Sequence, residues 1–235
     1  YMHFHQPKPG FYRFASQVSN RELIRRLQLG EETPIKLSFT QAVRTREQLA
    51  GLMGSKLLLD SAEVKQRLDD PTYMSHFGLT PETAVCLFIP NTYEVYWTMS
   101  ADQLFTRMYK EYQRFWNEER RAKAQALGLT PVEVATLASI VASETNKTSE
   151  HPLIASLYLN RLNKGIALQA CPTVIYAVGN FKMRRVLKRH LAIDSPYNTY
   201  KNRGLPPGPI RLARPDVMDA VLNAPKTDYL YMCAN

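Results

Sequence analysis

Apolar residues recur at the i, i+3, i+4 spacing of an α-helix over most of the chain, and this pattern predicts a mainly helical protein. The segments with this spacing are 19–30, 45–56, 61–69, 101–127, 130–146 and 152–163. IKLSF (35–39) instead alternates apolar and polar residues, as a half-buried strand does, and the aromatic patch at 11–14 also favours an extended chain. Long helices with a few short strands indicate the α+β class.

The helix at 130–146 has the clearest boundaries. Thr130 suits the N-cap, Pro131 suits the first helical position, and Glu133 completes a capping box. At helical spacing, one face of this helix collects Val134, Leu137, Ile140, Val141 and Glu144. A carboxylate therefore extends an apolar stripe.

Burial on that stripe would favour the neutral carboxyl of Glu144 and raise its pKa. An acid that keeps its proton near neutral pH can protonate a leaving sugar oxygen, which cleavage of a glycosidic bond requires. The alternative is that Glu144, near the helix end, turns outward and is simply solvated, as most helical glutamates are.

Several further segments carry long and specific strings. They are LFIPNTYEVYW (87–97), ASIVASETNK (138–147), 154–179, DSPYNTYKNRGLPPGPI (194–210) and TDYLYMCAN (227–235). Their order and spacing resemble the MltG/YceG-like endolytic murein transglycosylases, over about residues 35–235. The resemblance implies a bacterial enzyme that cuts the MurNAc–GlcNAc β-1,4 bond within nascent peptidoglycan strands. The products would carry 1,6-anhydroMurNAc ends, and strand elongation would stop.

The resemblance also implies a domain organisation. A LysM-like subdomain, a strand–helix–helix–strand unit that binds glycan, is expected at 1–40, and its alternative is a packing module without a ligand. A YceG-like catalytic domain is expected at 41–235, continuing beyond the last residue. No stretch here approaches the roughly 20 apolar residues of a membrane-spanning helix. The family implies such an anchor ahead of Tyr1, with the catalytic domain on the periplasmic side of the inner membrane.

One carboxyl can suffice for the implied reaction, because the C6 hydroxyl of the muramic acid attacks C1 and no enzyme nucleophile is needed. The family commonly shows Glu-x-Glu-Thr at this helix, whereas this chain has Ala142-Ser143-Glu144-Thr145. Glu144 alone matches the catalytic position. The mechanism implies no metal and no cofactor.

The string YNTY has the composition of a saccharide-binding wall, since Tyr rings offer flat apolar faces while Asn and Thr offer directional hydrogen bonds. Its members are Tyr197, Asn198, Thr199 and Tyr200. The alternative is that these residues form a buried polar network that holds the loop together. Asn160 and Gln169 are further candidates for substrate contact, and Asn160 could equally stabilise a helix junction.

Two positions bear on alternative readings of the site. Asp194 is a possible second catalytic carboxylate, although a turn cap is favoured. Cys171 stands where the family most often has Asp. A hydrolytic muramidase using Glu144, Asp194 and water therefore stays open. So does a catalytically silent glycan-binding module, because Ala142 and Cys171 depart from the family pattern.

The formal charge of +9 indicates an anionic partner or surface. Nucleic acid is disfavoured, because the basic residues are dispersed and no nucleic-acid-binding signature accompanies them. The densest basic cluster is Lys182, Arg184, Arg185, Lys188, Arg189 and His190, and a solvated helix face explains it most simply. The expected partners are peptidoglycan strands and, through the resemblance, peptidoglycan synthases or divisome proteins. Cys86 and Cys233 sit in apolar surroundings and are expected to be buried thiols.

Overall fold

The computed structural model describes residues 6–183 and 185–232 of the 235-residue chain. Its elements are α1 (Asn20–Leu29), β1 (Ile35–Ser38), α2 (Arg46–Lys56), α3 (Ser61–Asp69), α4 (Pro71–Ser75), the 3₁₀ helix η1 (Pro81–Leu87), β2 (Thr92–Val95), α5 (Ala101–Phe115), α6 (Glu118–Ala126), α7 (Pro131–Glu144), the 3₁₀ helix η2 (Thr148–Glu150), α8 (His151–Asn163), α9 (Cys171–Val178), α10 (Lys188–Leu191) and α11 (Pro215–Leu222). A mainly helical chain with one small sheet confirms the predicted α+β class.

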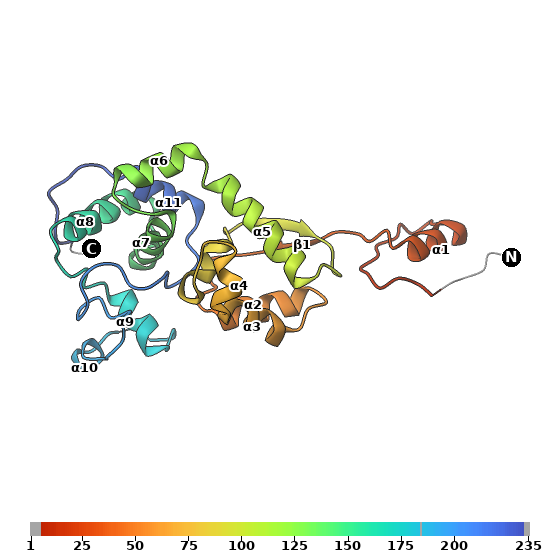
Figure 1. The fold of residues 1–235 in the computed structure, drawn as a ribbon, viewed down its shortest axis with the longest axis horizontal. Helices are drawn as coiled ribbons and strands as arrows, with labels where there is room; N and C mark the ends of the chain where they lie inside the picture. The colour runs from red at the N-terminus through yellow and green to blue at the C-terminus, as the bar shows by residue number, and fades with distance from the viewer. Residues whose placement is uncertain (1–5, 184, 233–235) are drawn as a thin grey trace.

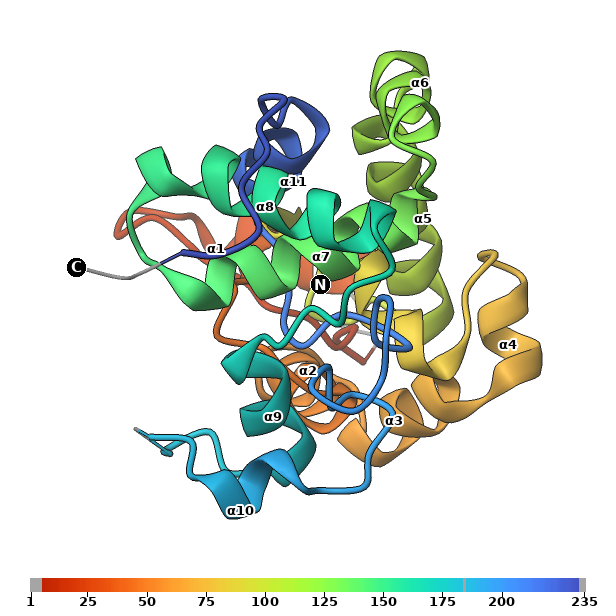
Figure 2. The same ribbon diagram turned by 90° about the vertical axis from the view of Figure 1, so that its left-hand side faces the viewer.

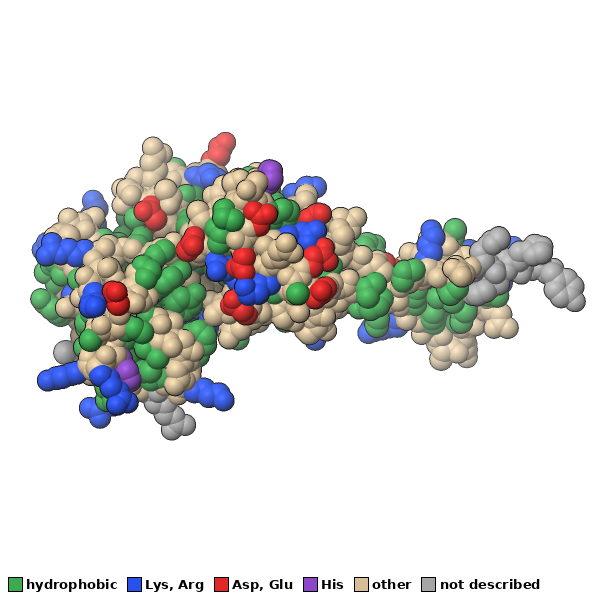
Figure 3. Space-filling model, turned by 60° about the horizontal axis from the view of Figure 1, so that its bottom comes forward, with side chains coloured by type: hydrophobic (Ala, Val, Ile, Leu, Met, Phe, Trp, Pro, Cys, Tyr) green, Lys and Arg blue, Asp and Glu red, His purple; other side chains and the backbone are tan. Residues whose placement is uncertain are grey.

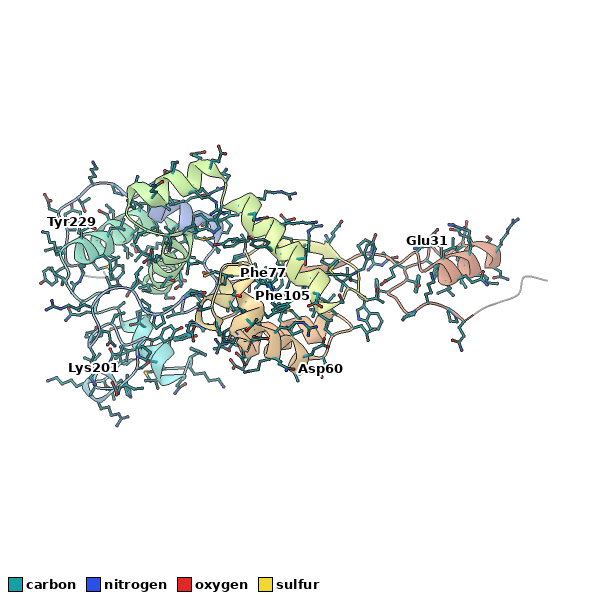
Figure 4. All side chains as sticks on the ribbon, viewed as in Figure 1. Glu31, Asp60, Phe77, Phe105, Lys201 and Tyr229 are labelled. Carbon is teal, nitrogen blue, oxygen red and sulfur yellow. The ribbon has the colours of Figure 1, made fainter. Side chains whose placement is uncertain are left out.

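The molecule is elongated (Figure 1). Helix α1 lies at one end, the β1–β2 sheet with α2 to α5 occupies the middle, and the helices from α6 onward form the other end. Aromatic rings fill the middle section. There Phe77 and Phe105 face each other with their centroids 6.1 Å apart (Figure 4).

The LysM-like subdomain expected at 1–40 is not confirmed. In the described part of that range, residues 6–40, the structure has helix α1 and strand β1, and the aromatic patch at 11–14 forms no strand. Strand β1 pairs antiparallel with β2, placing Leu37 opposite Tyr93. Between β1 and β2 the chain forms α2, α3, α4 and η1. The apolar face of β1 finds its partner about 55 residues further along the chain.

The long helix expected over 101–127 is interrupted. Helix α5 ends at Phe115 and α6 begins at Glu118, because Asn117 accepts the backbone N–H of Arg120 and starts a new helix. Between them the ring of Trp116 is buried. The Asn117 side chain competes with the helical hydrogen bonds, and the Trp116 ring turns inward. Together they explain the break between α5 and α6, which apolar spacing alone did not predict.

Helix α7 is the platform for the site. It packs against α8 and α11 (Figure 2), and every residue from Val134 to Ala142 is buried. No single helix in the described ranges is long and apolar enough to span a membrane. Helices α6 and α7 meet that test only as a pair, bent by 77°.

The segment 204–210 joins the two larger parts of the molecule. Its Gly208 lies against η1 so closely that an added Cβ would stand 2.2 Å from the carbonyl oxygen of Glu82. Two residues later, the backbone N–H of Ile210 donates to Ser139 Oγ in α7 at 3.0 Å. The segment thus fixes α7 relative to the middle section.

Candidate active site

Helix α7 delivers Glu144 to the site. Thr130 accepts the backbone N–H of Glu133, and the Glu133 carboxylate in turn accepts the N–H of Thr130, which confirms the predicted capping box. The apolar stripe is buried along its length, and Glu144 is half-buried as the last residue of the helix. The outward-turned, fully solvated Glu144 is therefore not what the structure shows.

Glu144 is held by one strong hydrogen bond. The hydroxyl of Tyr158, on α8, donates to Glu144 Oε1 at 2.6 Å. Burial raises the pKa of the Glu144 carboxyl, as predicted from its place on the stripe, and the Tyr158 hydroxyl partly opposes that rise by stabilising the carboxylate. Burial and the nearby carboxylate in turn raise the pKa of Tyr158 well above its usual value, so the phenol stays protonated and remains a donor.

The two carboxyl oxygens of Glu144 differ. Oε1 accepts from Tyr158, whereas Oε2 has no hydrogen-bond partner among the described residues. A carboxyl with one oxygen fixed and the other unpaired presents its proton in a defined direction. This is the arrangement that a general acid needs.

Tyr200 and Cys171 complete the cluster around Glu144. Cys171 Sγ lies 3.2 Å from the hydroxyl oxygen of Tyr200. Burial raises the pKa of Tyr200, and the Cys171 contact and the Glu144 charge raise it further. Side chains from α7, α8, α9 and the YNTY turn therefore converge on one place. Cys171 contacts the tyrosine from the first residue of α9.

The other members of the YNTY turn are divided between two roles. Asn198 is buried, and its amide donates to the carbonyl oxygens of Leu191 and Ile193 at 2.9 Å each. Thr199 is also buried, and its hydroxyl accepts the N–H of Ala170 at 3.0 Å. These contacts match the alternative of a polar network that holds the loop. Asn198 and Thr199 therefore position the turn, whereas Tyr197 and Tyr200 are partly exposed.

Gln169 and Asn160 are engaged with the protein. Arg161, a buried guanidinium, donates to Gln169 Oε1 at 2.7 Å and to the carbonyl of Leu230 at 2.8 Å. The amide of Asn160 donates to the carbonyls of Thr227 and Tyr229. Asn160 thus ties α8 to the 227–232 segment, which contains the Tyr229 labelled in Figure 4. Gln169 is exposed and has φ 55°. The hydrogen bond from Arg161 holds its side chain at the surface.

Asp194 does not cap its turn. Its side chain is fully exposed, at 104% of the reference area, and its ion pair is with Lys201 at 3.8 Å. The expected cap is wrong, because Ser195 Oγ accepts the backbone N–H of Tyr197 instead. A carboxylate in open solvent lacks the burial that Glu144 has.

Arg211 contacts the last turn of α7 and was not singled out from the sequence. Its guanidinium donates to the Gln41 carbonyl at 2.8 and 2.6 Å and to the Ala142 carbonyl at 3.4 Å. Burial, reinforced by Arg44 and Arg214, lowers the pKa of Arg211 to about 10. No carboxylate among the described residues forms an ion pair with it.

Charge elsewhere on the surface is mixed. Figure 3 shows Lys and Arg side chains scattered over the molecule, with Asp and Glu gathered over its middle. In the basic cluster Lys182, Arg185, Lys188 and Arg189 are exposed, but only α10 is helical; Arg184 lies outside the described residues. The described ranges contain no cluster of three or more His, Cys, Asp or Glu side chains arranged to hold a metal ion.

Of the two cysteines expected to be buried, Cys86 and Cys233, the structure describes only Cys86. Cys86 is buried as predicted, and burial raises the pKa of its thiol to about 12. Cys233 lies outside the described residues.

The chain is similar in sequence and in fold to several known proteins. A model of the YceG-like family matches residues 1–235. An endolytic murein transglycosylase of Bacillus subtilis is 49% identical over 102 residues, which are 43% of this chain and 28% of that protein. One of Streptococcus pneumoniae is 27% identical over 270 aligned residues, spanning 100% of this chain and 48% of that protein. The crystal structure of a yceG-like protein from Listeria monocytogenes aligns with a TM-score of 0.74 and 31% identity, over 95% of this chain and 78% of that one. The chain spans about half the length of the streptococcal relative. Its aligned residues cover less than a third of the Bacillus relative.

Proposed function

The chain belongs to the YceG-like family, and we propose that it is the catalytic part of an endolytic peptidoglycan lytic transglycosylase in which Glu144 is both acid and base. The observation that carries the proposal is the buried Glu144 carboxyl with Tyr158 on one oxygen. Two relatives that bear the name endolytic murein transglycosylase support the substrate class.

In the first step the protonated Glu144 gives its proton to the oxygen that links MurNAc C1 to GlcNAc. The C1–O bond breaks, GlcNAc leaves with a hydroxyl, and positive charge develops at C1. Oε2, which has no hydrogen-bond partner in the described part of the chain, is the oxygen from which the proton is donated. Tyr158 keeps Oε1 in place and stabilises the carboxylate that results.

In the second step the Glu144 carboxylate accepts the proton of the MurNAc C6 hydroxyl. The oxygen of that hydroxyl attacks C1 and closes the 1,6-anhydro ring, so the carboxyl is protonated again and ready for another cycle. No water is consumed. The partly exposed ring of Tyr200, beside Glu144, offers an apolar face to the sugar.

The alternatives are less well supported by the geometry. A muramidase would require Asp194 as a second carboxylate, and that side chain is exposed and paired with Lys201. A silent glycan-binding module would have no need for a carboxyl whose pKa is raised by burial. Action outside the cytoplasm, an N-terminal anchor and association with peptidoglycan synthases remain proposals that follow from the family.

Product analysis on purified peptidoglycan tests the proposal. We expect fragments whose MurNAc ends are lighter by one water, as the anhydro ring requires, and reducing ends in their place would overturn the lytic route. Glu144→Gln should lower cleavage by about a hundredfold or more, the usual contribution of a positioned acid. Asp194→Asn is the matched control, and we expect it to keep most of the activity. Equal activity of wild type and Glu144→Gln would show that the chain does not use this acid.

A further inference from the structure

A cavity of about 500 Å³ opens on the side of the YNTY turn that Tyr197 lines, and Glu144 is not among its lining residues. We call it the distal cavity. Its walls come from the start of α2, from η1, from the end of α9 and from the 196–209 segment. Its volume falls within the roughly 300–1,000 Å³ of small-molecule sites. The reaction described above makes no use of it.

Three aromatic rings form one wall of the distal cavity. The rings of Tyr176 and Tyr197 have centroids 4.6 Å apart and planes inclined by 44°, and Phe181 continues the wall 6.1 Å from Tyr176. The guanidinium of Arg44 lies 5.0 Å from the centroid of Phe181. Contiguous rings of this kind present flat apolar faces, against which the C–H groups of a pyranose can pack.

The lining of the cavity also carries charged groups of both signs. Glu47 and Glu82 are exposed carboxylates, and Arg46 contacts Asp69 at 2.7 Å. The backbone N–H of each glutamate holds the pKa of its carboxyl below the usual value, so both stay ionised at neutral pH as hydrogen-bond acceptors. Two acceptors and one cation in the same lining as an aromatic wall suit a neutral molecule rich in hydroxyls. They do not suit a polyanion, which two carboxylates would repel.

The YNTY turn connects the distal cavity with the active site. Tyr197 lines the cavity and Tyr200 lies beside Glu144, while buried Asn198 and Thr199 between them fix the turn. Gly208, whose backbone touches η1, holds the facing walls together. A polymer that crosses the turn can therefore contact both places at once.

We infer that the distal cavity is a second saccharide subsite, which binds a sugar ring of the same peptidoglycan strand at a distance from the bond being cut. The inference rests on the proposed function. It deepens that function by making the enzyme favour long strands over short fragments, since only a long strand can occupy both places.

Two variants test the subsite. Phe181→Ala removes part of the aromatic wall, and Glu82→Gln removes a charge at constant size. For each, the ratio of kcat/KM for long glycan strands to that for a tetrasaccharide should fall about tenfold, which is the loss of one modest contact of about 1.4 kcal/mol. The fall should appear in KM for the long strands. Leu187→Ala is the matched control, because Leu187 is exposed in the same part of the chain and does not line the cavity. An unchanged ratio, or an equal loss on both substrates, would overturn the inference.

A binding measurement separates this inference from the proposed chemistry. Purified glycan strands are titrated into Glu144→Gln, alone and combined with Phe181→Ala. Weaker binding of strands by the double variant supports the subsite even if the wild type cleaves nothing. Equal binding by the two proteins refutes the subsite and leaves the chemistry of Glu144 untouched.

Discussion

The hydroxyl of Tyr158 donates a hydrogen bond of 2.6 Å to Glu144 Oε1, joining side chains 14 residues apart on neighbouring helices. The pair combines two opposed effects on one carboxyl. Burial raises the pKa of Glu144 and the phenol lowers it, with burial the larger. Tyr158 therefore sets how far the acid is shifted as well as where it points.

Replacing Tyr158 with Phe should move the alkaline limb of the activity profile to higher pH. A hydrogen bond to a charged group contributes about 1.5–3 kcal/mol, and one pKa unit corresponds to about 1.4 kcal/mol, so we expect a rise of roughly one to two units. The pH dependence of kcat/KM measures it. Tyr112→Phe, at another buried tyrosine, is the control and should leave the limb in place. A shift toward lower pH in Tyr158→Phe would contradict the assigned donor.

Glu144→Gln should stabilise the folded protein at neutral pH. Because burial raises the pKa of Glu144 in the folded state, the folded protein binds more protons than the unfolded chain between the two pKa values. Stability therefore falls as pH rises through that window. Below the unfolded pKa of about 4.3 both states carry the proton, and the penalty is absent.

Thermal unfolding of both proteins from about pH 4 to about pH 8 measures this effect. The Tm of Glu144→Gln should exceed that of the wild type near neutral pH, and the gap should close toward the acid end. Asp194→Asn serves as a control at an exposed carboxylate. A gap that widened on acidification would rule out a raised pKa at Glu144.

Ala142→Glu should create an ion pair with Arg211. Arg211 donates to the Ala142 carbonyl and has no carboxylate partner among the described residues. A glutamate at 142 would pair with Arg211 and add a like charge near Glu144, so the alkaline limb of activity should rise by a fraction of a unit to about one unit. Ala142→Gln has the same size without the charge. If both variants shift the limb equally, the effect is steric and the pairing is refuted.

Gly208→Ala should destabilise the protein by overpacking. The new Cβ would stand 2.2 Å from the Glu82 carbonyl oxygen, and backbone cannot yield as a side-chain end does. We expect a loss of about 1–3 kcal/mol in the free energy of unfolding, measured by denaturant titration. Gly204→Asn is the control, since Gly204 has φ 83° with open space around it and Asn tolerates that conformation. A loss at Gly208 no greater than that at Gly204 would mean that segment 204–210 can shift away from η1.

The helix at 130–146 shows what could be predicted without a structure. Its capping box and its apolar stripe follow from spacing within one helix, and both are confirmed. The same spacing left open whether Glu144 is buried or turned outward, and the structure shows burial that raises the pKa of its carboxyl. The same local reasoning placed α2, α3 and α8 within a residue or so. It failed at Trp116, where an inward ring and an Asn117 cap ended a helix whose apolar spacing continued.

What the sequence determined by itself was the set of elements and the one carboxyl that lies on an apolar face, because periodicity is a property of consecutive residues. Only the tertiary structure decided that Tyr158 meets Glu144, that Asn198 and Thr199 turn inward, and that Tyr197 lines the distal cavity while Tyr200 contacts Cys171. The sequence also did not predict that β1 pairs with β2. These outcomes depend on how α7, α8, α9 and the YNTY turn pack together, and the spacing of residues within one segment carries no information about the orientation of the next.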